Sequence, residues 1–306
     1  MSVESRVPAT ENDHYHACPL CAGTALRSLA AADRLDVHWQ LLRCASCGLH
    51  LTDPRPSEEF LDRLYADHYH ANLHAPGATE RIFGPKYHGY AAWLKGVLPR
   101  GRVLDLGCST GLLVRLLCDR GYQAEGLEIN PQTAAWGRDH YGVTIHNHLF
   151  EDPSYDAEPF DAILMTDVLE HMRDPLAFLR LVVQRLRPGG IVLVTFPDIQ
   201  SVEARYWRLL SRLTGRSWLW GHWHVPEHIF EFTAPTARRL FDAAGLEVAR
   251  FRRSHLDRQA DDNRIPALVR LLKLPVNTLG WPPLAGWFGT QLEFLLRKPD
   301  TAGPRT

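Results

Sequence analysis

Two glycines and two acidic residues in the middle of the chain have the spacing of a nucleoside-binding site. Asp105 lies near the end of a short apolar run, and Gly107 and Gly111 follow in a turn that opens into a helical pattern. Glycines allow a tight turn and a close approach of a ligand to the backbone. About twenty residues further on, a second apolar run ends at Glu128, whose carboxylate can accept hydrogen bonds from both hydroxyls of a ribose. The pattern therefore predicts a bound nucleoside.

The same turn indicates the kind of nucleoside. A dinucleotide site binds pyrophosphate through free backbone N–H groups at a helix N-terminus, in a Gly-x-Gly-x-x-Gly sequence, whereas this turn is Gly-x-x-x-Gly. Asp105 would repel a phosphate but would accept a hydrogen bond from an ammonium group. The pattern Asp-x-Gly-x-x-x-Gly with an acidic second strand resembles class I S-adenosylmethionine-dependent methyltransferases.

This resemblance implies S-adenosyl-L-methionine as the cofactor. The family often has an acidic residue near the adenine after the third strand, and Leu149 or Phe150 is expected to provide an apolar contact there instead. The implied cofactor-binding residues are Asp105, Gly107, Cys108, Ser109, Gly111, Glu128, Ile129, Asn130, Leu149, Phe150 and Asp167.

The residues of this turn also allow an alternative interpretation. Residues 107–111 also match the Gly-x-Ser-x-Gly nucleophile elbow of α/β-hydrolases, with Ser109 as the nucleophile. That interpretation leaves the pairing of Asp105 with Glu128 unexplained, so methyl transfer is the preferred hypothesis.

Four of the six cysteines form two Cys-x-x-Cys pairs, Cys18 with Cys21 and Cys44 with Cys47. Two such pairs about twenty residues apart are typical of a tetrahedral zinc site. A closed site of four thiolates has no open position for catalysis, so the predicted Zn²⁺ is structural. Redox-active or incidental pairs are the alternative.

Strands alternate with helices from residue 100 onward. Apolar runs predict strands at 102–106, 123–129, 143–148, 160–167, 191–196, 246–253 and 290–298, and the intervening patterns predict helices, one of them capped by Thr233. This order predicts an α/β fold with a Rossmann-like, doubly wound sheet. The stretches Phe-Asp-Ala-Ile, Asp-Val-Leu-Glu-His and Leu-Arg-Pro-Gly-Gly extend the methyltransferase resemblance over roughly residues 100 to 253, which implies the family's seven-stranded sheet.

The predicted domain organisation places a small zinc ribbon before this sheet. The knuckles flank a hairpin pattern at 26–42, and Ser57 can cap a helix. The order of cysteine knuckles, the stretch Thr-Asp-Pro-Arg-Pro-Ser and a tyrosine-rich helix end is similar to the N-terminal region of bacterial methyltransferases of sugar and secondary-metabolite pathways. The expected parts are a disordered tail (1–14), a zinc ribbon (15–56), a helical substrate or cap region (57–99), the cofactor domain (100–254 and 290–299) and a helical insertion or cap (255–289). A dimer contact or a membrane-touching surface is the alternative for the insertion.

Histidines on the ligand side of the predicted sheet are candidates for the general base. His228 follows an insert, residues 198–232, that is rich in tryptophan and histidine, and Glu227 precedes it. Similar sugar methyltransferases carry a Glu-His pair in this region as the proposed base. His171, just past the fourth strand, is the second candidate. The spacing of His222, His224 and His228 matches no closed metal site, so we do not expect a second metal there.

Composition restricts the function further. The formal net charge is −1 and the pI is about 7.0, which argues against a protein that mainly binds nucleic acid. No secretion signal or membrane-spanning run is visible, so we expect a cytoplasmic protein. The prediction is methyl transfer to a small-molecule acceptor, a hydroxyl of a sugar or secondary metabolite. The alternatives are a C-methyltransferase of a nucleotide-linked sugar, and a zinc-ribbon nucleic-acid-binding protein or RNA methyltransferase.

Overall fold

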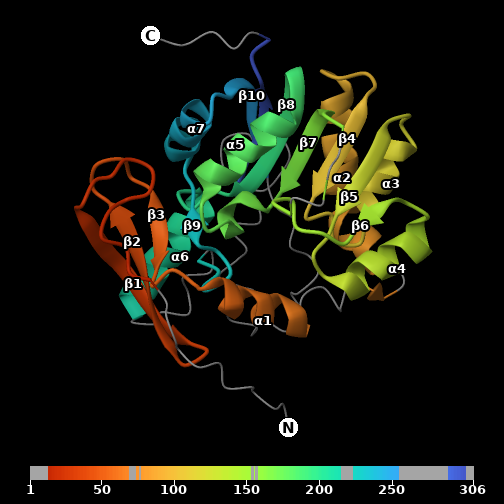
Figure 1. Cartoon of the computed structure of the whole chain (residues 1–306). Coiled ribbons are helices and arrows are strands. Elements are labelled where there is room, and N and C mark those ends of the chain that lie inside the picture. Colours follow the sequence, from red (N-terminus) through yellow and green to blue (C-terminus); the bar gives the residue numbers. More distant parts are fainter. Residues whose placement is uncertain are drawn as a thin grey trace.

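The computed structural model contains a large sheet and a small sheet (Figure 1). It describes residues 13–68, 74–75, 77–152, 155, 158–214, 223–254 and 289–300. Three predictions lie outside these residues: the tail over residues 1–12, the insertion over 255–288, and the part of the aromatic insert over 215–222, which includes His222.

The large sheet has seven strands. In chain order they are β4 (Arg102–Leu106), β5 (Gln123–Leu127), β6 (Ile145–His146), β7 (Phe160–Thr166), β8 (Leu186–Pro197), β10 (Glu247–Ser254) and β11 (Gln291–Arg297). Their spatial order is β10-β11-β8-β7-β4-β5-β6. Pairing is parallel from β6 to β8, whereas β11 runs antiparallel to both of its neighbours. The predicted doubly wound, seven-stranded α/β sheet is confirmed.

Helices cover both faces of this sheet. Apolar side chains of α2 (Ala78–Lys95), α3 (Leu112–Cys118) and α4 (Pro131–Tyr141) pack on one face, and those of α5 (Pro175–Arg185) and α7 (Ala234–Ala243) pack on the other. Consequently β7 and β8 are buried along nearly their whole length, as parallel strands between two helical layers must be. Thr233 forms a capping box at the start of α7, as the sequence predicts.

Two element boundaries differ from the sequence prediction. α2 begins at Ala78 and contains Pro85, whereas the sequence pattern before the first strand of the large sheet predicts a helix over 86–98. β8 begins at Leu186, before the Pro-Gly-Gly turn that was expected to precede it, because Leu186 already pairs with Phe160 of β7 before the register shifts.

The small sheet combines distant parts of the chain. Its strands are β1 (Leu26–Arg34), β2 (Val37–Cys44), β3 (His50–Asp53) and β9 (Phe230–Glu231), in that spatial order. The predicted hairpin corresponds to β1 and β2. The sequence did not predict β3 or β9, because strands of four and two residues become visible only through their pairing. That pairing connects the zinc-ribbon region directly to the segment that carries His228.

Two further helices lie next to the small sheet. α1 (Glu58–His68) begins as predicted, because Ser57 Oγ accepts a hydrogen bond of 3.1 Å from the Phe60 N–H. α6 (Val202–Thr214) lies in the aromatic insert, where no helix was predicted, and runs beside the small sheet (Figure 1).

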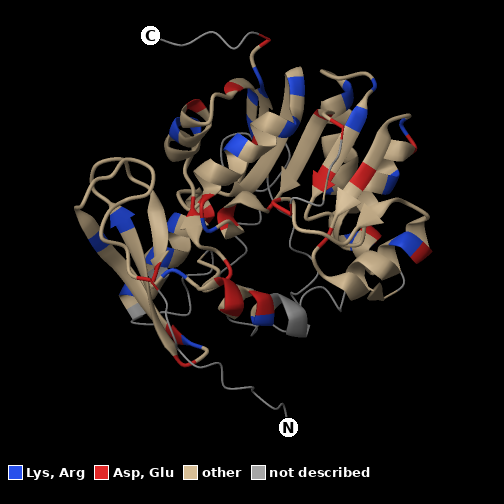
Figure 2. Ribbon diagram, in the orientation of Figure 1, with Lys and Arg blue, Asp and Glu red and all other residues tan. Residues whose placement is uncertain are grey.

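One apolar core joins the two sheets. Leu49 and Leu51 belong to the same buried cluster as Phe196 of β8 and Phe241 of α7. Asp13 also pairs with Arg55 in an isolated bridge, so the last residues of the expected tail contact the small sheet. Lys and Arg alternate with Asp and Glu over the described elements (Figure 2), in keeping with the nearly zero net charge.

Candidate functional site

The candidate site is the edge of the large sheet where the chain connections change direction. From β4 the chain proceeds to β5 and β6 on one side, whereas β7 and β8 lie on the other. These strands are parallel, so their carboxyl ends share one edge, and open α/β sheets bind ligands outside that edge at such a point. Asp105 lies near the carboxyl end of β4, residues 107–111 follow that strand, and residues 167–171 follow β7. Two groups of predicted residues therefore lie at one edge of the sheet.

Glycine is required at both ends of the turn after β4. Gly107 has a φ of 65° and Gly111 a φ of 81°, a region that other residues rarely adopt. A Cβ atom on Gly107 would lie 2.9 Å from Val168 Cγ2, and one on Gly111 would lie 2.7 Å from Ile145 Cδ1. Cys108 is buried with its thiol towards Gly126, so its side chain faces the neighbouring strand.

Asp105 is a buried carboxyl group that needs a partner. Its side chain is 2% exposed, and Oδ1 has no hydrogen-bond partner among the described residues. Burial, followed by the nearby Glu128 carboxylate, raises the pKa of Asp105 to about 8. A ligand ammonium group would supply both a hydrogen bond and a compensating positive charge. The carboxyl group thus fits the methionine end of S-adenosyl-L-methionine.

Glu128 lies at the end of β5, one strand away from Asp105. Its Oε2 accepts a hydrogen bond of 2.9 Å from the Ser109 N–H, and its Oε1 accepts one of 2.8 Å from the Asn130 N–H. Each carboxylate oxygen has a second lone pair, so the group can accept two ribose hydroxyls as well. The carboxylate therefore connects the turn after β4 to the start of α4.

Asn147 supports this edge and was missed by sequence reasoning. Its Nδ2 donates to the backbone oxygens of Glu128 and Ile129, at 2.8 Å each. Its position after the short strand β6 was the only signal that could have identified it. The contact fixes the strand end that presents Glu128.

Apolar side chains next to this edge differ in exposure. Ile129 is 47% exposed and Leu149 is 59% exposed, so both offer apolar surface to an adenine ring. The Phe150 ring, in contrast, is buried against Phe178, with ring centroids 5.7 Å apart. Leu149 is consequently the better placed of the two residues predicted to contact adenine.

Asp167 already binds several protein groups. Its Oδ2 lies 2.6 Å from Lys86 Nζ, and its Oδ1 accepts hydrogen bonds from Thr195 Oγ1 and Gln291 Nε2. These contacts tie the end of β7 to α2, β8 and β11. Lys86 was not singled out from the sequence, because nothing in a helical pattern identifies one lysine as the partner of a distant carboxylate.

His171 and His228 lie together beyond the end of β7. Their ring centroids are 4.8 Å apart, with the rings nearly perpendicular. His171 Nδ1 lies 2.7 Å from the backbone oxygen of Glu227, which can only accept, so Nδ1 of His171 carries a proton. Burial, followed by the neighbouring His228, lowers the pKa of His171 to about 3. Because a general base works best with a pKa near working pH, His171 is the weaker candidate.

The carboxylate next to His228 is that of Glu231, not Glu227. His228 Nδ1 lies 3.0 Å from Glu231 Oε1, and both side chains are buried. The Glu227 carboxylate instead binds the Arg34 guanidinium, at 3.0 and 3.2 Å. The expectation that Glu227 orients His228 is corrected accordingly, because the turn between them brings the residue three positions later, rather than the preceding one, to the imidazole.

Glu170 adds a third polar group to this pair of histidines. It is buried, and neither carboxylate oxygen has a hydrogen-bond partner among the described residues. Burial, followed by Asp167, raises the pKa of Glu170 well above its usual value. Ligand atoms of Glu170, His171 and His228 all lie within 4.8 Å of one another, so the arrangement can donate or accept a proton or contact a cation.

The four cysteines of the two knuckles converge as predicted. Their sulfur atoms all lie within 4.8 Å of one another, with Cys18 to Cys47 at 3.5 Å and Cys21 to Cys44 at 3.6 Å. Tetrahedral zinc with bonds of about 2.3 Å requires sulfur separations of roughly 3.8 Å. Burial tends to raise the pKa of Cys44, but backbone N–H groups and neighbouring thiols outweigh it and lower the pKa to about 6. The donor set fits zinc.

A buried carboxyl group at the end of β4, whose Oδ1 has no partner among the described residues, and an acidic residue after β5 are typical of nucleoside-binding α/β proteins of the methyltransferase type. The model of the family described as "Methyltransferase domain" matches residues 59–250, well over half of the chain. The chain belongs to this family and is an S-adenosylmethionine-dependent methyltransferase. The hydrolase interpretation of Ser109 was therefore wrong.

Named relatives agree with this family. A ubiquinone biosynthesis O-methyltransferase from Cereibacter sphaeroides is 26% identical over 186 residues, which are 55% of this chain and 73% of that protein. One from Xanthomonas campestris pv. campestris is 33% identical over 104 residues, 32% of this chain and 44% of that protein. The match thus spans less than half the length of the second relative.

Solved structures show the same fold. A chain from the complex between the Haloferax volcanii Trm112 methyltransferase activator and a methyltransferase has a TM-score of 0.54 at 20% identity, covering 74% of this chain and 96% of that one. The plantazolicin methyltransferase BamL has a TM-score of 0.51 at 14% identity, with coverages of 76% and 90%. Among the described residues, no helix has the length and apolar character needed to cross a membrane.

Proposed function

We propose that this protein methylates a hydroxyl group of a small molecule, a sugar or a secondary metabolite, with His228 as the general base. The observation that carries the proposal is the pairing of His228 Nδ1 with the buried Glu231 carboxylate. That carboxylate favours the tautomer with a proton on Nδ1, which leaves Nε2 to accept a proton from the acceptor hydroxyl. The relatives named as O-methyltransferases support oxygen as the acceptor atom.

The residues at the carboxyl ends of β4, β5 and β7 have distinct roles in this proposal. Bound S-adenosyl-L-methionine would supply a methyl group activated by its sulfonium. Asp105 accepts the ammonium group, Glu128 accepts the ribose hydroxyls, and Ile129 and Leu149 flank the adenine. Asp167 positions the end of β7 through Lys86. Fixing two reactants in line provides much of the rate of such a transfer.

We also propose that Cys18, Cys21, Cys44 and Cys47 bind one structural zinc ion. The sulfur separations and the backbone donors around Cys44 support it. Because all four sulfurs would be ligands, the ion leaves no position open for substrate. Its role is to fix the ends of β2 and the start of β3, and thereby the small sheet.

The test is methyl transfer by the purified protein from labelled S-adenosyl-L-methionine to a panel of hydroxylated sugars, their nucleotide-linked forms and glycosylated metabolites. Mass spectrometry of the product identifies the methylated atom. An O-methyl product agrees with the proposal. A C-methyl product would replace it with the carbon-methylating alternative, and transfer to RNA alone would replace it with the nucleic-acid alternative.

A further inference from the structure

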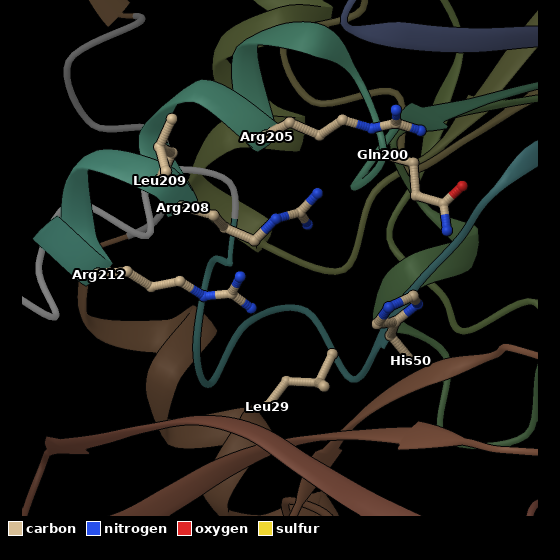
Figure 3. A pocket seen from close by; sticks show the side chains of 7 residues that line it. All are labelled: Leu29, His50, Gln200, Arg205, Arg208, Leu209 and Arg212. Atoms are coloured by element: carbon tan, nitrogen blue, oxygen red, sulfur yellow. The ribbon is translucent and has the colours of Figure 1, made fainter.

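A basic pocket lies between α6 and the small sheet, apart from the residues assigned to the cofactor (Figure 3). Its volume is about 330 Å³, within the range of roughly 300 to 1,000 Å³ typical of small-molecule sites. Three arginines of α6 line one side, and Leu29 and His50 of the small sheet line the other. Methyl transfer as proposed above uses none of these side chains.

The three arginines share one face of α6. Arg205, Arg208 and Arg212 are spaced by three and four residues, so each is a direct neighbour of the next on the helix surface. Like charges at this spacing destabilise a helix. Among the described residues, no carboxylate forms an ion pair with Arg205 or Arg212. The nearby Asp198 carboxylate binds Arg253 at 3.4 Å. It also attracts Arg205 and Arg208 electrostatically, so one negative charge lies near three arginines. The face therefore carries positive charge that a bound anion would neutralise.

Two side chains in the pocket are already arranged for a ligand. Arg208 Nη1 donates to the Ile199 backbone oxygen at 2.7 Å, which fixes its guanidinium group. His50 is only 3% exposed, yet its Nδ1 has no hydrogen-bond partner in the part of the chain that the structure describes. In Figure 3, Arg208 and Arg212 extend from α6 towards the space that His50 and Leu29 border. A buried, unpartnered nitrogen opposite a row of guanidinium groups indicates a missing polar ligand.

We propose that this pocket binds the phosphate or diphosphate group of the small-molecule acceptor. Guanidinium groups match phosphate oxygens in pairs, and three of them suit a group with several negative charges. Leu29 and Leu209 add apolar surface for the organic part of the ligand. The basic residues form a compact cluster on one helix face rather than a long stripe, which favours a small molecule over a nucleic acid.

The small sheet connects this pocket to the proposed base. His50 of β3 is the cross-strand partner of Glu231 of β9, and cross-strand partners project to the same face of a sheet. Glu231 in turn contacts His228. A phosphate in the pocket would thus place the rest of the acceptor on the side where His228 lies. This last step rests on the proposed function, whereas anion binding itself does not.

Calorimetric titration of the full-length protein with inorganic diphosphate, without cofactor, tests the pocket directly. The double variant R205Q/R212Q removes two charges from exposed positions, and R180Q/R239Q is the matched control with two exposed helix arginines elsewhere. We expect wild type and control to bind diphosphate equally and R205Q/R212Q to bind at least about tenfold more weakly. Equal affinity in R205Q/R212Q, or no binding by wild type, would overturn the proposal.

Two further arms identify the source of the phosphate and separate this inference from the proposed function. Acceptors that carry a phosphate should be methylated, and the same compounds without the phosphate should not. Methylation of the phosphate-free compounds in place of the phosphorylated ones would show that the pocket binds only free phosphate. Single-stranded RNA that binds through the arginines and is not displaced by diphosphate would also overturn the proposal. S-adenosylhomocysteine affinity should be the same in all variants, so a pocket without diphosphate affinity leaves the methyltransferase assignment intact.

Discussion

Asp105 shows how burial turns an ordinary carboxyl group into a selective binding group. Its Oδ1 lacks a partner among the described residues, and Glu128 lies near enough to raise its pKa further. The unliganded site therefore favours the protonated form at neutral pH. Binding of an ammonium group must reverse this preference, so cofactor binding is coupled to loss of a proton.

This coupling predicts the pH dependence of affinity. Below a pKa of about 8, Asp105 is protonated and must lose its proton before it can bind the ammonium group. Affinity for S-adenosylhomocysteine should thus rise with pH, by up to about tenfold per unit, and level off above about pH 8. Calorimetry between pH 5.5 and 8.5 measures this. Asp105→Asn should bind weakly with a flat pH profile; an equally steep profile in that variant would assign the effect to another group.

His228 and Glu231 act as a unit in the proposed proton transfer. His228→Ala should lower turnover by about 10² to 10⁴, because the acceptor hydroxyl loses its base. Glu231→Gln should lower it by a smaller factor, since the amide cannot stabilise the charged imidazole. Both should keep normal affinity for S-adenosylhomocysteine, as should the surface control His38→Ala.

Turnover with labelled cofactor is the measurement for these variants. If Glu227→Gln reduced turnover more than Glu231→Gln, the original assignment of Glu227 would be restored. If His171→Ala alone abolished turnover, His171 would be the base despite its lowered pKa.

The pairing of β3 with β9 positions the segment that carries His228, the proposed base. Thr52 of β3 is fully buried, and its Oγ1 donates to the His228 backbone oxygen at 2.7 Å and accepts from Trp223 Nε1 at 3.0 Å. Its N–H also donates to the Ile229 oxygen. One threonine thus connects the small sheet to both sides of the turn that presents His228.

Thr52→Val keeps the shape but leaves two buried polar groups without partners. The free energy of unfolding should fall by about 1–3 kcal/mol, and turnover should fall while affinity for S-adenosylhomocysteine is retained. Chemical denaturation measures the first quantity, with the exposed Thr144→Val as control. A variant with wild-type stability and turnover would show that this contact does not position His228.

Removal of the proposed zinc should abolish turnover, which depends on the small sheet, and should leave cofactor binding by the large sheet intact. Chelation, or Cys44→Ser, removes the ion that fixes β2 and β3, so turnover should be lost while cofactor affinity remains. Elemental analysis should find one zinc per chain in wild type and in the exposed control Cys118→Ser. A zinc-free Cys44→Ser protein with normal turnover would contradict this role. A second metal equivalent would show that Glu170, His171 and His228 bind a cation.

The parts of the fold that the sequence predicted are those encoded locally. Buried parallel strands such as β4 and β7 contain short apolar runs between turn signals, Val103-Leu104 and Ala162–Met165, and the Thr233 cap depends on residues within one helical turn. The spacing within the two Cys-x-x-Cys pairs and in the Gly107 turn is itself sufficient to predict a zinc site and a nucleoside site.

Long-range contacts were not predictable in this way. β9 has two residues and exists only because β3 lies beside it. Glu231 and Lys86 act through partners that the three-dimensional fold brings near, and Asn147 supports Glu128 from another strand. Sequence reasoning could therefore propose the cofactor turn from local spacing, but it paired His228 with Glu227 and not with Glu231.

The molecule combines two sheets with different tasks on one core. The large sheet carries the proposed cofactor residues at the carboxyl ends of its parallel strands. The small sheet contains Cys44 and the strand next to His228, and it forms one side of the basic pocket. Because the apolar cluster is continuous between them, a change in one sheet is transmitted to the position of the other. Cofactor binding should nevertheless depend on the large sheet alone.

Calorimetric titration with S-adenosylhomocysteine tests the central assignment most directly. Wild type should bind one molecule per chain, and the exposed control Glu158→Ala should bind equally well. Glu128→Ala should bind at least about tenfold more weakly, because both ribose hydroxyls lose their charged acceptor and the Ser109 and Asn130 N–H groups lose theirs. No binding by wild type, or equal affinity in Glu128→Ala, would contradict the placement of the cofactor at the ends of β4 and β5.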